Sequence, residues 1–238
     1  MFPFDPVTTG TMLILAGAAP KICQIPQPAE ISVVPKAQQL VIDTSRTSAE
    51  IQGQKIDTIN PYGYNSVTHT NGFMEGRIGM RSEVKLDYKQ APTKKRAYCV
   101  WYESVTIELE IDPKIVIAKE VAQDRCMYNA VLEHEMKHIN VDRKIVNKYA
   151  KTIGQKVFQG LKQRGFIAGP IGPEYAQSVI DRMKSTVNQL IELENKKMEI
   201  ERSEAQQAVD SLEEYEYVQS KCPNYKPPAS ASRSRKRN

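Results

Sequence analysis

The stretch 131–142, "VLEHEMKHINVD", places two of the chain's three histidines, His134 and His138, four residues apart, and Glu135 directly follows the first. A four-residue step on an α-helix advances by about 400°, so both imidazoles project from nearly the same face, one turn apart. At this spacing two imidazoles can reach one Zn²⁺. Glu135 lies about 100° around the helix, beside the metal position, where it can take a proton from a water that attacks a carbonyl.

A catalytic zinc needs a third protein ligand and leaves its fourth position to water. The remaining histidine, His69, lies upstream in a loop-like region, and we interpret it as incidental. A carboxylate is therefore the expected third ligand. Asp142 lies about 12 Å along the helix axis from His134, too far to share its metal, so we expect it at the surface or orienting His138.

Strands are expected before this segment. In residues 105–111 apolar residues alternate with polar ones, which predicts a strand with one exposed face, and Asp112-Pro113 ends it. A second short strand is predicted over 115–118. Residues 60–80 are rich in Gly, Asn, Tyr and Thr, which predicts loops and turns.

Two helices are expected after Asp124, a good N-cap residue. Apolar residues recur at helical spacing up to Arg164, with Gly154 and Gly160 as possible kinks, and "GFIAGPIGPE" breaks the pattern. Pro173 suits the first turn of a second helix, which contains no Gly or Pro up to about Gln219. The predicted class is α+β: a small N-terminal antiparallel sheet with loops, then the active-site helix within a long antiparallel helical hairpin.

The second helix supplies the candidate third ligand. If it starts near Glu174 and packs antiparallel to the first helix, His134 faces Glu204. Glu201 lies close to this register and within the apolar stripe of the second helix. A carboxylate there costs several kcal/mol in desolvation unless it is paired or bound to a metal. We therefore predict Glu201 as the ligand, with Glu204 and then Asp210 as alternatives.

The arrangement His-Glu-x-x-His resembles the zincin metallopeptidases. The metzincin extension is absent, because Val141 and Lys144 stand where it requires Gly and His, so the resemblance is gluzincin-like and implies two histidines and a carboxylate. The segment "HEMKHINVDRKIVNKYAKTI", followed by "QQAVD", is also similar to a family of predicted bacterial secreted zinc proteases, over roughly residues 97–215. That family pairs the His-Glu-x-x-His helix with a later glutamine-and-aspartate segment, so this likeness keeps Asp210 as an alternative ligand. The family also has a further histidine, and this chain departs from it with Tyr215 near that position.

The whole chain sets outer limits. Of 238 residues, 40% are hydrophobic and 26% charged, which is globular usage. The sequence contains no stretch of about 18 apolar residues, so no integral membrane span is predicted. The net charge of +5 resides partly in a Pro/Ala/Ser-rich basic tail, and no basic helix with interleaved aromatics appears, so nucleic-acid binding is set aside. The expected order is a leader or disordered N-terminus (1–23), a β-rich part (24–123), the helical hairpin (124–220) and a disordered basic tail (221–238).

The four cysteines predict two disulfides and, with the possible leader, a periplasmic or secreted protein. Cys126 and Cys222 lie at the same end of the hairpin, but a bond from Cys99 to Cys126 is equally compatible with the sequence. The sequence does not choose among the three pairings that Cys23, Cys99, Cys126 and Cys222 allow.

The function predicted from these features is hydrolysis of peptide or protein substrates by a Zn²⁺ enzyme with Glu135 as general base and His134, His138 and Glu201 as ligands. Tyr215, Tyr217 or another tyrosine is expected to stabilise the oxyanion. The alternative is a non-enzymatic, coiled-coil-like interaction protein of the cell envelope, whose second helix binds a partner and whose histidine pair is structural or incidental. Oligomeric state is not predicted.

Overall fold

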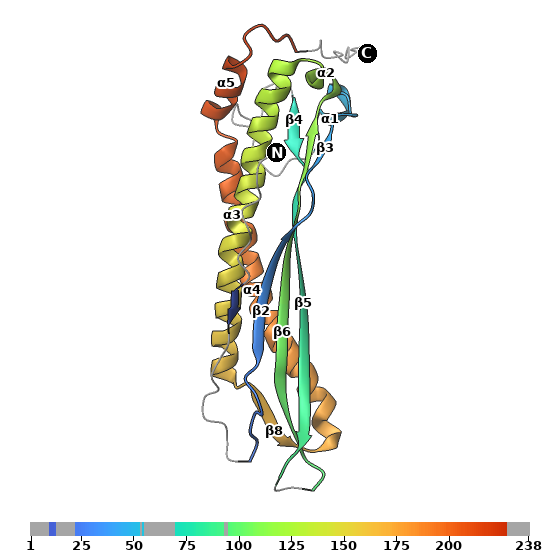
Figure 1. The fold of residues 1–238 in the computed structure, drawn as a ribbon, viewed down its shortest axis with the longest axis vertical. Helices are drawn as coiled ribbons and strands as arrows, with labels where there is room; N and C mark the ends of the chain where they lie inside the picture. Colours follow the sequence, from blue (N-terminus) through green and yellow to red (C-terminus); the bar gives the residue numbers. More distant parts are fainter. Residues whose placement is uncertain (1–9, 13–21, 53, 55–69, 93–94, 228–238) are drawn as a thin grey trace, which may run out of the picture. The chain divides into compact units, whose positions relative to one another are not determined.

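The computed structural model describes residues 10–12, 22–52, 54, 70–92 and 95–227. Most strands precede the long helices, which confirms the α+β class (Figure 1). The elements are β1 (Gly10–Met12), β2 (Glu30–Ala37), β3 (Val41–Asp43), α1 (Ser48–Ile51), β4 (Gly72–Met74), β5 (Arg77–Gln90), β6 (Tyr98–Asp112), β7 (Lys114–Ile117), α2 (Lys119–Ala122), α3 (Arg125–Arg164), β8 (Ile167–Ile171), α4 (Pro173–Val209) and α5 (Leu212–Ser220). His69, most of the expected leader and the end of the tail lie outside the described residues.

The chain divides into two compact units, each with its own sheet. The first comprises the described parts of residues 1–36, 78–110 and 145–199, and its sheet has the order β1-β2-β6-β5, with β8 also paired to β6. The second comprises those of 37–77, 111–144 and 200–238, with the sheet β3-β7-β4. The expected single antiparallel sheet is thus two sheets, and β3 pairs with β7 in parallel. Each unit contains both strands and helical segments, whereas the sequence predicted a β-rich part followed by a helical hairpin.

The predicted strands are found. β6 contains 105–111, and its alternate residues Val105, Ile107 and Leu109 are fully buried. Pro113 separates it from β7, the second predicted strand. The prediction of loops over 60–80 is wrong for its described end, since β4 and the start of β5 lie there. Apolar residues do alternate in "RIGMRSEVKLDY", and β5 was missed because most of its side chains are exposed.

The helices follow the predicted bounds with two differences. α3 runs through Gly154 and Gly160 without interruption. A Cβ at Gly160 would lie 2.5 Å from Leu190 Cδ1, so this glycine permits close packing in the first unit. The second predicted helix is two helices, because α4 ends at Val209 and α5 begins after Asp210 and Ser211.

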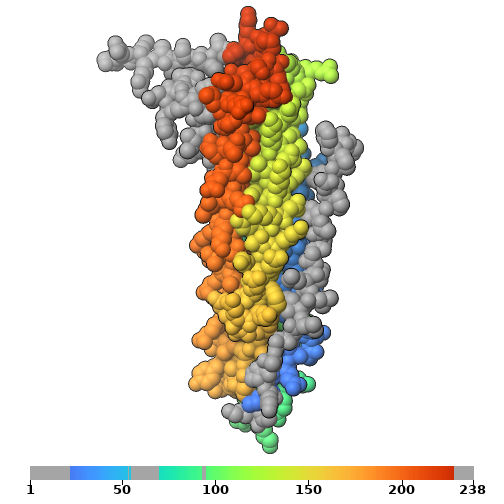
Figure 2. Space-filling view, turned by 90° about the vertical axis from the view of Figure 1, so that its left-hand side faces the viewer, coloured from blue at the N-terminus to red at the C-terminus, as the bar shows by residue number. Residues whose placement is uncertain are grey.

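The second unit has its own hydrophobic core beneath β7. Buried side chains of this strand, among them Ile115 and Ile117, pack with Val131 and Ile139 of α3. β4 comes very close to α3, since a Cβ at Gly72 would lie 2.7 Å from Val131 Cγ1. In this unit the first half of α3 lies beside the end of α4 and α5, the green and the orange-to-red segments of Figure 2. The predicted histidine pair is on this part of α3.

Candidate metal centre

Three ligand-type atoms converge in the second unit. Nε2 of His134 lies 3.1 Å from Oδ1 of Asp210, Nε2 of His138 lies 3.2 Å from the same oxygen, and the two nitrogens are 3.4 Å apart. Tetrahedral zinc with bonds of about 2.0 to 2.2 Å separates its ligands by about 3.3 to 3.5 Å. The three atoms therefore outline one face of a tetrahedral site, and all three residues are at most 8% exposed.

His138 is oriented by Gln206. The amide nitrogen Nε2 of Gln206 donates to Asp142 Oδ1 at 2.7 Å and to the carbonyl oxygen of His138 at 3.1 Å. The amide oxygen Oε1 consequently faces Nδ1 of His138, at 2.5 Å, and accepts its proton. This fixes the tautomer that leaves the lone pair of Nε2 directed at Asp210. Asp142 orients His138 through Gln206, in keeping with one of the two roles expected for it.

His134 has an equivalent partner on α5. Its Nδ1 donates to Oε1 of Glu214 at 3.4 Å, and Nζ of Lys137 donates to the same oxygen at 2.6 Å. Burial acts to raise the pKa of Glu214, but the hydrogen bonds from Lys137 and His134 outweigh it and lower that pKa. A charged acceptor at Nδ1 again leaves the lone pair of Nε2 facing Asp210.

This donor set fits a divalent cation. With protons on both Nδ1 atoms, three acceptor atoms face one another in a buried space, an arrangement that is repulsive without a proton or a cation between them. Neutral imidazole and carboxylate are ligands that zinc prefers, and acceptors behind the ring nitrogens are the usual support of such ligands. His134, His138 and Asp210 would hold the metal.

Glu135 lies beside this group and faces β4. It is 4% exposed, and a carboxylate oxygen lies within 4.8 Å of the ligand nitrogens. Asp210 Oδ1 is within hydrogen-bonding distance of both Nε2 atoms, so Asp210 is the candidate third ligand, and Glu135, which follows His134 on the helix, is the candidate general base. Burial raises the pKa of Glu135 to about 7, although the two imidazoles and the backbone N–H of Met74 act to lower it.

The imidazoles bind protons more tightly than usual in the metal-free protein. Burial lowers the pKa of His134 and of His138, but hydrogen bonds to Asp210 and the nearby carboxylate charges outweigh burial, and both pKa values are raised. A metal at these nitrogens would compete with protons, so its binding would become stronger as the pH rises.

The structure brings Asp210, and not Glu201, to the two imidazoles. Glu201 lies nine residues before Asp210, about 13 Å along a helix axis, beside Arg202, which contacts Asp142. Its side chain cannot reach the imidazoles from there, and Glu204 is exposed. His134 faces Asp210 instead of Glu204, so α4 is displaced along α3 by about 9 Å from the register assumed from the sequence. The sequence register assumed a simple turn between the helices, whereas residues 167–171 form β8, which pairs with β6.

Sequence reasoning also missed Gln206 and Glu214, which support the imidazoles. A break between α4 and α5 brings Asp210 and Glu214 to the site. Its signal is Ser211 followed three residues later by Glu214, the pattern of a helix N-terminus. The Ser211 side chain indeed accepts from the N–H of Glu214 and caps α5. This capping pattern, rather than a search for Gly or Pro, would have located the break.

The two predicted disulfides are present. Cys126 pairs with Cys222, which ties the start of α3 to the residues just after α5, and Cys23 pairs with Cys99 in the first unit. α5 has no buried residue, and its partly buried Val218 packs against the core of the second unit. The Cys126–Cys222 bond therefore has a direct part in keeping Glu214 near His134.

Replacing Cys126 and Cys222 together with serine should weaken zinc binding by about 10-fold, the loss typical of a disturbed partner of a metal ligand. It should also reduce the free energy of unfolding by about 2 to 5 kcal/mol. Chelator competition and urea denaturation measure the two effects. The matched control replaces Cys23 and Cys99 with serine, which should reduce stability but leave zinc affinity unchanged; equal losses of affinity would refute a local role for α5.

None of the helices among the described residues is both long and apolar enough to cross a membrane. Comparisons of the chain with protein-family models, curated proteins and solved structures found no match.

Proposed function

We propose that this chain is a zinc-dependent peptidase. The observation that carries the proposal is the convergence of the two Nε2 atoms and Asp210 Oδ1 within 3.4 Å of one another, beside a buried glutamate. Incidental histidines on a solvated helix face would not share a buried carboxylate or have an acceptor behind each ring.

Bound zinc would supply a Lewis acid that polarises the scissile carbonyl and acidifies a water molecule. Glu135 would take the proton of the attacking water and pass it to the leaving amine. A pKa of about 7 suits both steps, because the carboxylate gains and loses a proton readily near neutral pH. The cation would lower this pKa by its charge, which favours the basic form before attack.

β4 is the candidate strand for binding an extended peptide. It lies at an edge of its sheet, and the N–H of Glu75 donates to Lys114 on the β7 side. By the alternation of an antiparallel pair, the N–H of Met74 points away from β7, toward Glu135. A peptide added to this edge would run beside the general base.

Tyr215 is the better placed of the two tyrosines named from the sequence as oxyanion donors. Its ring centroid lies 5.6 Å from that of His134, in an edge-to-face arrangement. Tyr217 is 49% exposed and lies beneath the ammonium groups of Lys137 and Lys221. We therefore propose Tyr215 for this role.

A second candidate function is a non-enzymatic protein with a structural metal. One observation favours it: His134, Glu135, His138 and Asp210 are all buried together, and structural zinc sites have four protein ligands and no open position. On this hypothesis the metal would stabilise the second unit, and α4 would present its charged face to a partner.

Metal content and chelation distinguish the two functions. As a peptidase, the purified protein should contain one zinc per chain and cleave unstructured peptides; a chelator should abolish cleavage, and added zinc should restore it. As a structural site, the chelator should reduce the melting temperature of a protein that cleaves nothing. Absence of zinc after purification in its presence would refute both. The two disulfides support a periplasmic or secreted location, where such bonds persist.

A further inference from the structure

Three consecutive residues at the end of β4 are held by three different parts of the second unit. The N–H of Met74 is bonded to Glu135 of α3. The carboxylate of Glu75 accepts from Lys114 of β7 at 2.6 Å and from Arg46 at 3.2 Å. The carbonyl oxygen of Gly76 accepts from Nη2 of Arg202, on α4, at 3.2 Å.

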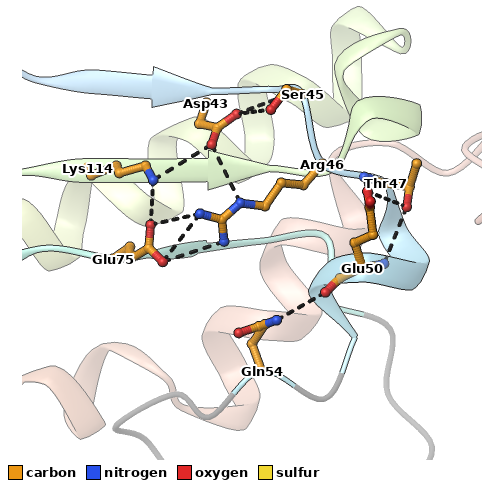
Figure 3. Close-up of polar contacts among 8 residues, drawn as sticks. All are labelled: Asp43, Ser45, Arg46, Thr47, Glu50, Gln54, Glu75 and Lys114. Atoms are coloured by element: carbon orange, nitrogen blue, oxygen red, sulfur yellow. Dashed lines mark hydrogen bonds and ion pairs between the residues drawn. The ribbon is translucent and has the colours of Figure 1, made fainter.

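The contacts of Glu75 connect β4 to its own sheet. Lys114 and Arg46 also approach Asp43 of β3. The carboxylates of Asp43 and Glu75 therefore share the same two cationic side chains (Figure 3). The Glu75 and Lys114 side chains are 41% and 31% exposed, and ion pairs this accessible contribute little. The backbone bond from Glu75 to Lys114 holds β4 within the sheet, and none of these contacts connects β4 to the metal-binding residues.

Arg202 connects β4 to the metal-binding residues. Its Nε donates to Asp142 Oδ1 at 2.6 Å, and Nη2 donates to Oδ2 at 3.1 Å, a two-pronged contact with a side chain that is 1% exposed. Asp142 in turn accepts from Gln206, which holds Nδ1 of His138. One guanidinium therefore joins the support of a metal ligand to the carbonyl group two residues after Met74.

Neutralising the charge of Asp142 does not by itself explain why Arg202 contacts both Asp142 and Gly76. A counter-ion for a buried carboxylate needs only proximity, and an ammonium would supply it. The planar guanidinium reaches both carboxylate oxygens and, from the same Nη2 atom, the carbonyl of Gly76. The additional bond fixes the backbone at the end of the edge strand.

We propose that Arg202 is a positioning residue that holds β4 against α3, so that a peptide bound along β4 lies in register with Glu135 and the metal. This rests on the proposed function. Arg202 touches neither metal nor substrate; it acts through the backbone of Gly76 on one side and through Asp142 and Gln206 on the other.

The test compares R202K with R77K in the zinc-loaded protein. Lysine at 202 keeps the charge beside Asp142 but loses the planar fork. Arg77 is the matched control, because it adjoins Gly76 and its side chain is 82% exposed in a pair with Asp112. Three quantities are measured: zinc affinity, amide hydrogen exchange of residues 72–76, and KM and kcat for short and extended peptides.

For R202K we expect zinc affinity within about threefold of wild type and at least about 10-fold faster exchange of the Met74 amide. KM for extended peptides should rise by about 10-fold, with kcat and the shortest substrates much less affected. R77K should change none of these. The double variant D142N/R202M, which buries no unpaired charge and keeps an acceptor for Gln206, should reproduce the R202K pattern.

Unchanged exchange at 72–76 in both Arg202 variants would overturn the proposal, as would a loss of zinc affinity that accounts for the whole kinetic effect. In the latter case Arg202 would act only through His138. If the wild type cleaves no peptide, the proposed function fails, whereas the exchange measurement still decides whether Arg202 holds β4.

Discussion

Replacing Glu135 with glutamine should reduce kcat by about 10²- to 10⁴-fold while one zinc per chain remains bound. Glutamine preserves the shape of the side chain and leaves His134, His138 and Asp210 in place, but its amide cannot accept the proton of the attacking water. Peptide hydrolysis and metal analysis of the same preparation measure the two quantities.

Glu133→Gln is the matched control. Glu133 is on the same helix, but its side chain is 56% exposed and pairs with Lys221 at 2.8 Å. This variant should hydrolyse peptides at the wild-type rate. Near-normal hydrolysis by Glu135→Gln would contradict the general-base role, and loss of zinc from it would show that Glu135 acts as a ligand.

The same variant should reveal the burial of Glu135 through the pH dependence of stability. In the metal-free protein the folded-state pKa is about 7, above the usual 4.5, so folding is favoured while this carboxyl is protonated. Its stabilising contribution is fully present below about pH 4.5 and is lost as the pH rises through about 7. The difference corresponds to roughly 3 kcal/mol. With a chelator present, Glu135→Gln should therefore melt above wild type at pH 8 and close to it at pH 5.

Replacing Asp210 with alanine should weaken zinc binding by more than about 100-fold, beyond the 10- to 100-fold typical of residues that support a ligand. Gln206→Ala and Glu214→Ala should fall within that smaller range, because each removes one acceptor behind an imidazole. Chelator competition on the purified variants gives the affinities.

Glu201→Ala is the control for this series, since the sequence register assigned the third ligand to that residue. Its zinc affinity should stay within about threefold of wild type, because its side chain lies at the level of Asp142 on the helix. The reverse result, weak binding in Glu201→Ala and normal binding in Asp210→Ala, would restore the register taken from a simple hairpin.

Local patterns were sufficient where one element carries the information. The sequence correctly predicted the strand β6, its end at Pro113 and the helix α3. Burial of one face of a strand or helix leaves a repeating pattern of apolar residues. β5 has the same alternation, but little of it is buried, and it was missed. The break after Val209 was missed because Ser and Glu can also continue a helix, and only the capped geometry distinguishes the two.

The sequence by itself determined that His134 and His138 share one helix face with Glu135 beside them, because a helical step of four residues leaves little freedom. It did not determine which carboxylate meets them. That depends on how far α4 is displaced along α3, on the turn at Asp210 and Ser211, and on which cysteines pair. Such long-range relations follow from the packing of separate elements, so only the tertiary structure brings Asp210 to the imidazoles and β4 to Glu135.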